Sequence, residues 1–220
     1  MIRFIDVYKE YDNGTKALKG VSMRIDDGEF VFLVGPSGSG KSTIIKLITG
    51  EIATTEGRLM VNGYNMNNIR PGQVPYMRRT LGIIFQDFRL IEKKTVYENL
   101  SFAMRAIGTS TRELRRRIPY VLELVGLEKK ADQYPGELSG GEQQRVAIAR
   151  ALAAGSRVIL ADEPTGSLDS DNGRMIVETL QRLAHQEERC VIVVTHDPKV
   201  AEAADIRLHM QDGKLSGEEA

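Results

Sequence analysis

The chain has 220 residues, of which 41% are hydrophobic and 27% are charged, so it can form a buried core and is neither collagen-like nor disordered. Thirty basic residues balance thirty acidic ones, and this balance gives no general attraction for nucleic acid or for an anionic membrane. No apolar run approaches the roughly 20 residues that cross a bilayer, and the first residues lack the apolar segment of a signal peptide.

The first part of the chain has the pattern of short β-strands that lead to one buried strand. The continuous apolar run of that buried strand ends at Gly35, a glycine-rich loop follows, and Gly50 ends the helix after the loop. Residues 57–86 are expected to return to β character, with turns at 62–63 and 70–72. The predicted elements are strands at 2–8, 20–25, 29–34 and 81–86 and a helix at 42–49.

The rest of the chain is first helical and then alternates between strand and helix. Residues 96–154 are rich in Leu, Glu, Arg and Ala, which predicts an inserted helical subdomain. The alternation that follows predicts a largely parallel sheet with helices on its faces. The predicted elements are strands at 157–161 and 190–195, helices at 173–187 and 199–204, and a frayed acidic tail at 217–220.

A phosphate-binding loop is predicted between the first buried strand and the first helix. The segment from Gly35 to Ser42 matches the P-loop pattern in the strand–loop–helix context that this pattern requires, which disfavours a merely structural glycine-rich turn. Its N–H groups attract a polyphosphate, Lys41 reaches the β- and γ-phosphates, and Ser42 can ligate magnesium. The candidate nucleotide-binding residues are Gly35, Pro36, Ser37, Gly38, Ser39, Gly40, Lys41, Ser42 and Thr43.

Two adjacent carboxylates, Asp162 and Glu163, follow the apolar run 157–161 at its carboxyl end. Ligands bind at this edge of open α/β sheets. An acidic pair after a strand is often only a solvated turn, but beside a P-loop it suits two tasks. Asp162 is placed to hold a magnesium ion, and Glu163 is placed to act as general base on the attacking water.

A second glycine-containing segment, Leu138-Ser-Gly-Gly-Glu-Gln-Gln-Arg145, has the sequence of a helix start. Ser139 and Glu142 have the spacing of a capping box, which by itself would explain both residues. The pair Gly140 and Gly141 weakens a helix start unless another group approaches closely. We therefore expect Ser139, Gly140, Gly141 and Glu142 to bind the anionic ligand as a second cradle of backbone N–H groups.

This segment resembles the signature motif of ABC ATPases, and the other motifs of that family follow in their proper order over nearly the whole chain. The resemblance implies that Tyr11 stacks on adenine, that Gln86 contacts magnesium and the attacking water, and that Asp169 belongs to the D-loop. It also places His196 at the γ-phosphate. Taken singly these signals are weak: Tyr8 is a rival for Tyr11, and a lone histidine is usually structural or solvated.

The resemblance also predicts the architecture of one ABC cassette over 1–220, with ATP and Mg²⁺ as cofactors. It implies a P-loop NTPase core of RecA type with a mostly parallel sheet, a β subdomain in the N-terminal part and a helical subdomain at 87–155. The core itself is expected in 1–86 and 156–220. The family's chains form an ATP-bound homodimer in which each ATP lies between the P-loop of one copy and Ser139 to Gly141 of the other.

Within this family the chain resembles the cell-division ATPases, which act on the cytoplasmic side of the cell membrane with an FtsX-like integral membrane protein. Lipoprotein-releasing and macrolide-export ATPases resemble the same stretches, and a nucleotide-gated scaffold for other division proteins fits the same motifs. The membrane partner is expected to dock on the surface formed by Asp87, Phe88, Arg89, Leu90 and Tyr97.

Two further features are interpreted without a functional role. The basic run Arg112 to Arg117 is predicted to be a solvated helix face, because neither interleaved aromatics nor overall basic charge supports nucleic-acid binding. The single cysteine, Cys190, excludes an internal disulfide and precedes an apolar strand, so it is expected to be a buried thiol.

Overall fold

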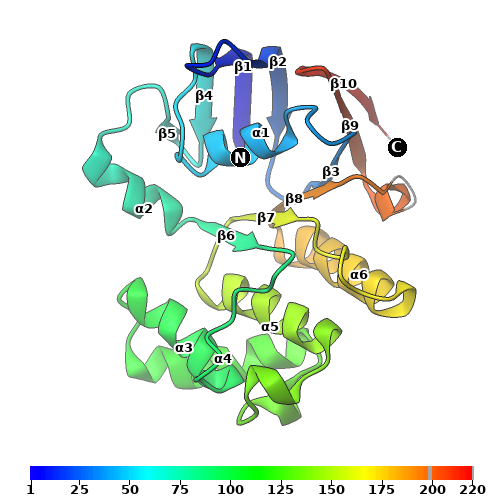
Figure 1. The fold of residues 1–220 in the computed structure, drawn as a ribbon. Coiled ribbons are helices and arrows are strands. Elements are labelled where there is room, and N and C mark those ends of the chain that lie inside the picture. Colours follow the sequence, from blue (N-terminus) through cyan, green and yellow to red (C-terminus); the bar gives the residue numbers. More distant parts are fainter. Residues whose placement is uncertain (198–199, 220) are drawn as a thin grey trace.

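The computed structural model describes residues 1–197 and 200–219. A four-stranded antiparallel sheet lies at one end of the molecule, a six-stranded sheet crosses its middle, and helices occupy the other end (Figure 1). The antiparallel sheet has the order β2 (Lys16–Ile25), β1 (Ile2–Glu10), β4 (Glu56–Val61) and β5 (Tyr64–Asn65). Alternate residues of β1, among them Ile2 and Phe4, are buried, so one face of this sheet packs on the core.

The central sheet has the order β10 (Lys214–Glu219), β9 (Ile206–Gln211), β3 (Phe30–Val34), β8 (Cys190–Thr195), β7 (Val158–Asp162) and β6 (Leu81–Ile84). Only the β9–β10 pair is antiparallel, and the other pairs are parallel. Every residue of β3 and β8 is buried, as expected for parallel strands covered on both faces. The carboxyl ends of β3, β6, β7 and β8 therefore lie along one edge of the sheet.

Helices cover both faces of the central sheet. Helix α1 (Lys41–Ile48) lies between the two sheets, and its residues Ile44 and Leu47 share one buried cluster with both of them (Figure 1). Helix α6 (Ser170–Glu187) packs on the opposite face, where Ile176 and Leu180 belong to the cluster that contains Phe30. The loop before α1 is thereby fixed at the edge of the sheet.

The helices α3 (Val96–Ala106), α4 (Thr111–Leu124) and α5 (Gly140–Ala153) form a lobe beside the central sheet. Each begins at a hydroxyl residue that caps it, namely Thr95, Ser110 and Ser139. Two short 3-10 turns, Glu128–Lys130 and Pro135–Glu137, lead from α4 to α5. The lobe's buried side chains are continuous with those under α6, so the lobe is packed onto the core rather than tethered to it.

The structure differs from the sequence prediction at several elements. Region 57–86 also holds a 3-10 turn (Pro71–Gln73) and helix α2 (Val74–Arg78). Arg78 Nε donates to the Thr49 carbonyl at 2.8 Å and so connects α2 to the end of α1. Strands β9 and β10 were not predicted, and the backbone of 217–219 pairs in β10 instead of fraying. The helix expected at 199–204 is a 3-10 turn at Val200–Ala203, while Lys199 lies outside the described residues.

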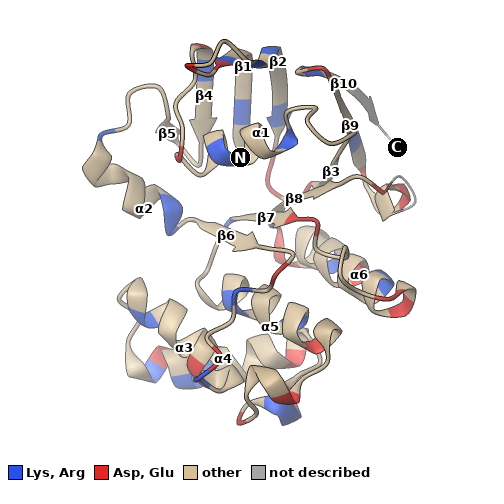
Figure 2. Cartoon of the chain, viewed as in Figure 1, with Lys and Arg blue, Asp and Glu red and all other residues tan. Residues whose placement is uncertain are grey.

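Acidic and basic residues are interspersed along the described helices and strands (Figure 2). None of the described helices is both long enough and apolar enough to span a membrane. Cys190 is fully buried at the start of β8, which confirms the expected core thiol, and this burial raises the pKa of the thiol to about 12.

Candidate active site

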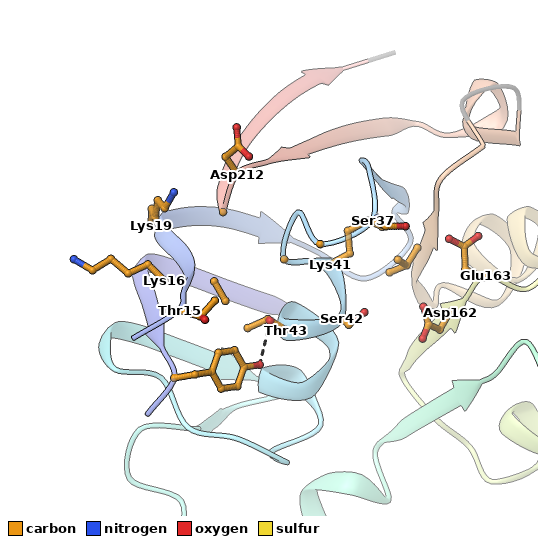
Figure 3. Close-up of a pocket in the computed structure, with 16 residues that line it drawn as sticks. Thr15, Lys16, Lys19, Ser37, Lys41, Ser42, Thr43, Asp162, Glu163 and Asp212 are labelled. Atoms are coloured by element: carbon orange, nitrogen blue, oxygen red, sulfur yellow. Dashed lines mark hydrogen bonds between the residues drawn. The ribbon is translucent and has the colours of Figure 1, made fainter. Parts of the chain in front are cut away.

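A cleft of about 640 Å³ opens between the antiparallel sheet and the carboxyl edge of the central sheet. It brings together residues that are far apart in the sequence (Figure 3). Phosphate-binding candidates from the start of α1 lie at the same end of the cleft as the acidic pair after β7. The predicted residues that line it are Tyr11, Ser37, Gly38, Gly40, Lys41, Ser42, Thr43, Asp162 and Glu163, whereas Gly35, Pro36 and Ser39 do not.

The loop before α1 has the geometry that its glycines permit. Gly38 and Gly40 adopt φ values of 79° and 113°, which residues with a side chain rarely adopt. A methyl group on Gly35 would lie 2.1 Å from the Met210 carbonyl oxygen, so β9 packs directly against this loop. The buried Lys41 donates from Nζ to the carbonyls of Gly35 at 2.6 Å and Pro36 at 2.9 Å. Its ammonium group is therefore held at the mouth of the loop.

Asp162 and Ser42 present side-chain oxygen atoms on facing sides of the cleft (Figure 3). Burial, and secondarily the neighbouring Glu163, raise the pKa of Asp162, while Lys41 and Arg89 act in the opposite direction. No group of three or more His, Cys, Asp or Glu side chains that could hold a metal ion occurs among the described residues. One carboxylate and one hydroxyl beside a phosphate-binding loop are a donor set that suits Mg²⁺, which is usually completed by phosphate and water.

Glu163 and His196 are joined directly. His196 Nδ1 lies 2.7 Å from Glu163 Oε1, and the histidine side chain is 69% exposed while that of the glutamate is 21% exposed. Glu163 has a φ of 48°, which is unusual for a residue with a side chain. Its N–H donates to the Val194 carbonyl at 2.9 Å, and its own carbonyl accepts from Gly166 at 3.1 Å. These bonds hold the strained backbone and aim the carboxylate into the cleft.

Gln86 does not line the main cleft but an adjacent hollow of about 460 Å³, which Asp162 and Ser167 also line. Ser167 Oγ donates to the Gln86 carbonyl at 3.4 Å. The next residues, Phe88 and Arg89, have φ values of 55° and 49°.

Arg150 of α5 holds this left-handed turn. Its guanidinium donates to the Phe88 carbonyl at 3.1 Å and to the Arg89 carbonyl at 2.5 Å, and burial lowers the pKa of Arg150. The sequence analysis missed Arg150, because no motif distinguishes it from the other basic residues of its helix. It connects the Gln86 loop to the helix that begins at Ser139.

Tyr11 lies in the cleft, and its hydroxyl is 3.2 Å from Thr43 Oγ1. The rival residue Tyr8 lies outside, with its hydroxyl against Gly20. The sequence analysis also missed Val194, which neighbours Asp162 in the sheet, and the residues at the end of the cleft away from Asp162 (Figure 3). The residues at that end are Thr15, Lys16, Ala17, Lys19, Asp212 and Gly213, and the last two belong to the β9–β10 turn, which was not predicted.

The predicted second cradle does not line the cleft of its own chain. Ser139 caps α5, and Glu142 Oε2 accepts from the Ser139 N–H at 2.8 Å. This bond lowers the pKa of Glu142, and Lys130 Nζ lies 3.2 Å from its other oxygen. Gly140 and Gly141 therefore begin a capped helix at one end of the lobe, where Gly140 is half-buried and Gly141 is buried.

The structure adds a reason for the second glycine. A methyl group on Gly141 would lie 2.4 Å from Asn172 Oδ1, so the first turn of α6 is a close neighbour of this glycine. Asp169 caps α6 and accepts from the Asn172 N–H at 2.9 Å. Asp169 also lies outside the cleft of its own chain.

Comparison with known proteins agrees with this geometry. Residues 18–166 match the family model described as ABC transporter. The chain is 44% identical to the cell division ATP-binding protein FtsE of Streptococcus pneumoniae, over all of this chain and 96% of the relative. It is 46% identical to FtsE of Mycobacterium tuberculosis, over 92% of this chain and 88% of the relative.

Solved structures are similar over the full chain. The dimeric structure of the bacterial ABC transporter cassette MJ0796 is 39% identical, covers 100% of this chain and 98% of its own, and superimposes with a TM-score of 0.86. A second structure of that cassette, in a post-hydrolysis state bound to ADP and Pi, superimposes with a TM-score of 0.84. The chain therefore belongs to the ABC transporter family and, within it, to the group of FtsE-like ATP-binding proteins.

Proposed function

We propose that the chain is the ATP-hydrolysing subunit of a membrane complex that acts in bacterial cell division. The observation that carries this proposal is the single cleft in which Lys41 and Ser42 meet Asp162 and Glu163. A polyphosphate at the start of α1 would be bound by backbone N–H groups and by the Lys41 ammonium. The adenine end would extend toward Tyr11.

The reaction we assign is the attack of water on the γ-phosphorus of ATP, in which the bond to the oxygen that bridges the β- and γ-phosphates breaks and ADP leaves. Glu163 accepts a proton from that water, and His196, hydrogen-bonded to Glu163, orients the carboxylate and contacts the γ-phosphate. Bound Mg²⁺ would be held by Ser42, Asp162 and Gln86 and would neutralise charge on the phosphate oxygens. Burial disfavours the charged form of Asp162, which is why its pKa is raised. A cation beside this carboxylate would stabilise the charged form.

The complete site is formed by two copies of the chain. Gly140 and Gly141 carry N–H groups at the start of α5, whereas the Ser139 N–H is already paired with Glu142 Oε2. None of the three residues lines the cleft of its own chain, so this helix start would meet a phosphate that is bound by another copy. The related cassette MJ0796 is dimeric. We propose a twofold homodimer in which each ATP lies between the P-loop of one copy and Ser139 of the other.

The membrane partner is an FtsX-like integral membrane protein, which holds this chain at the cytoplasmic side of the cell membrane. Support comes from the relatives, which are cell division ATP-binding proteins. The chain's contribution is a nucleotide-dependent movement of the helical lobe, because Arg150 and Asn99 tie the loop after Gln86 to that lobe. Asn99 does so by accepting from the Ile91 N–H at 2.8 Å.

Two variants test the proposal. Glu163→Gln should bind ATP normally, form a stable dimer with ATP, and hydrolyse about 10² to 10⁴ times more slowly. Lys41→Ala should bind ATP roughly 10 to 100 times more weakly, since it loses the cation at the phosphates. The measurements are nucleotide titration, turnover and light scattering, with Lys46→Ala on the exposed side of α1 as a matched control.

The outcomes separate a motor from a scaffold. If Glu163→Gln supports cell division and Lys41→Ala does not, ATP binding alone is sufficient and hydrolysis only resets the complex. Normal turnover in Glu163→Gln would contradict the assignment of Glu163 as the general base. If the ATP-loaded Glu163→Gln protein were strictly monomeric, with and without its membrane partner, the proposed two-chain site would be wrong.

A further inference from the structure

The structure divides the basic run of α4 into two parts. Leu114 and Ile118 are buried in the lobe, whereas Arg116 and Arg117 turn with Tyr120 toward a second cavity of about 420 Å³. Arg115 is exposed and does not line this cavity. Part of the run is therefore more than a solvated helix face, because two of its arginines form the wall of a pocket.

The walls of this pocket come from the lobe and from the core. Leu124 of α4 and Leu152 of α5 provide apolar surface, and Arg189, the residue before β8, provides a third guanidinium. Because the catalytic cleft lies at the other end of β8, a six-residue strand, the two sites are separated by about 17 Å along it. We call this cavity, defined by Arg116, Arg117 and Arg189, the triple-arginine pocket.

The pocket carries an excess of positive charge. Glu187 is the only carboxylate that lines it, and its Oε1 accepts a hydrogen bond from the Tyr120 hydroxyl at 2.8 Å. Arg117 and Arg189 donate to the backbone carbonyls of Leu152 and Ser156, at 3.0 and 3.1 Å. Within the described part of the chain, none of the three arginines forms an ion pair with a carboxylate.

Two of these guanidiniums have unused hydrogen-bonding capacity. The Nε atoms of Arg117 and Arg189 are buried and have no hydrogen-bond partner in the described structure. A buried donor without a partner costs free energy, which a bound acceptor would recover. A guanidinium presents a planar fork of donors that matches a carboxylate or a phosphate oxygen pair.

We propose that the triple-arginine pocket docks an acidic segment of a partner protein, in which an Asp or Glu side chain stands beside an apolar one. The carboxylate would pair with the arginines, and the apolar side chain would cover Leu124 and Leu152. A segment with single negative charges fits better than a phosphate chain, because Glu187 repels a dianion more strongly and the floor is apolar. The charge complementarity thus selects an acidic peptide over nucleic acid or lipid headgroups.

A peptide selection on the full-length protein tests this assignment. A random dodecapeptide display library is selected on the wild-type chain after depletion on Arg116→Glu. Selected peptides should be enriched in Asp or Glu next to an apolar residue. Measured by fluorescence anisotropy, synthetic copies should bind Arg116→Glu at least about tenfold more weakly than the wild type, which corresponds to a loss of roughly 1.4 kcal/mol in binding free energy. Arg115→Glu, a change on the same helix outside the pocket, should bind them within about twofold of wild type.

Two controls make the outcome decisive. Circular dichroism and ATP turnover of both variants should equal those of the wild type, since neither residue touches the catalytic cleft. The proposal is overturned if the selected peptides show no acidic enrichment, or if Arg116→Glu and Arg115→Glu bind them equally. It is also overturned if phosphatidylglycerol vesicles or single-stranded DNA, rather than peptides, bind the wild type and not Arg116→Glu.

Discussion

His196 Nδ1 and Glu163 Oε1 lie 2.7 Å apart, although 33 residues separate them in the chain. Glu163 follows β7 and His196 follows β8, which are neighbouring parallel strands, so their carboxyl ends place the two side chains together. The exposed histidine lies on the solvent side of the less exposed carboxylate, and their hydrogen bond restricts the orientation of that carboxylate. The pair should consequently act as one unit in hydrolysis.

We expect the substitutions His196→Ala and Glu163→Gln to be non-additive. Each should lower the single-turnover rate of ATP hydrolysis by about 10² to 10⁴, and the double variant should be little slower than the slower single variant. His185→Ala is a matched control, because His185 is an exposed histidine that pairs with Asp205 at 2.8 Å. Multiplication of the two single effects in the double variant would show that the residues act independently.

The raised pKa of Asp162 predicts how stability depends on pH in the magnesium-free protein. Between its ordinary value of 3.8 and its raised value, the folded chain keeps a proton that the unfolded chain has lost. Stability therefore falls as pH rises through this interval and stays lower above it. Asp162→Asn removes the charge, so its Tm in EDTA should exceed that of the wild type by roughly 1–2 °C at pH 8.

The same comparison at a pH nearer the ordinary value of 3.8 should give a smaller difference, because less of the charge has then formed. With Mg²⁺ and ATP added, the order should reverse, since the variant lacks the carboxylate that would hold the cation. Thermal unfolding at pH 5, 6.5 and 8 measures both effects. An Asp162→Asn protein that is less stable than the wild type at every pH without metal would contradict the assigned burial cost.

Gly141→Ala should destabilise the protein without any ligand. The added methyl group would lie 2.4 Å from Asn172 Oδ1, and Asn172 cannot move freely because its Nδ2 donates to Asp169 at 2.7 Å. Overpacking of this kind costs about 1–3 kcal/mol in the free energy of unfolding, measurable by urea denaturation. Gly136→Ala, where a methyl group meets nothing within 4 Å, should change it by less than about 0.5 kcal/mol.

The surface expected to dock the membrane partner has half-buried and exposed members. Phe88, Leu90 and Tyr97 are half-buried, and the last two pack against the core of the lobe, whereas Phe102 of α3 is 55% exposed. We expect Phe88→Asp and Phe102→Asp each to lower co-purification with the membrane partner at least about tenfold. ATP binding and the fold should be retained.

The matched control for this surface is Tyr76→Asp, because Tyr76 is an aromatic residue that is 59% exposed on α2, outside the lobe. It should recover the partner at the wild-type level. Folded Phe88→Asp and Phe102→Asp proteins that recover as much partner as Tyr76→Asp would place the coupling surface elsewhere.

The sequence predicted the parts of the site whose residues are close together in the chain. The loop from Gly35 to Thr43, the acidic pair after β7 and the capping box at Ser139 depend on local geometry, namely a strand end, a helix start and a spacing of three residues. Fold class followed in the same way from the order of strands and helices. Strand β9 was missed although Ile206, Leu208 and Met210 alternate with polar residues, whereas β10 has little apolar pattern of its own and is held by its pairing with β9.

The sequence by itself thus determined which groups can bind phosphate, hold a cation and accept a proton. Only the tertiary structure decided which of these groups meet. Arg150 reaches the Phe88 carbonyl across 62 residues, and Asn172 explains Gly141 across 31. Such contacts depend on how strands are ordered and how helices pack on them, and side-chain type alone does not specify either. For the same reason, only the structure showed that Arg116 and Arg117 line a pocket that the neighbouring Arg115 does not line.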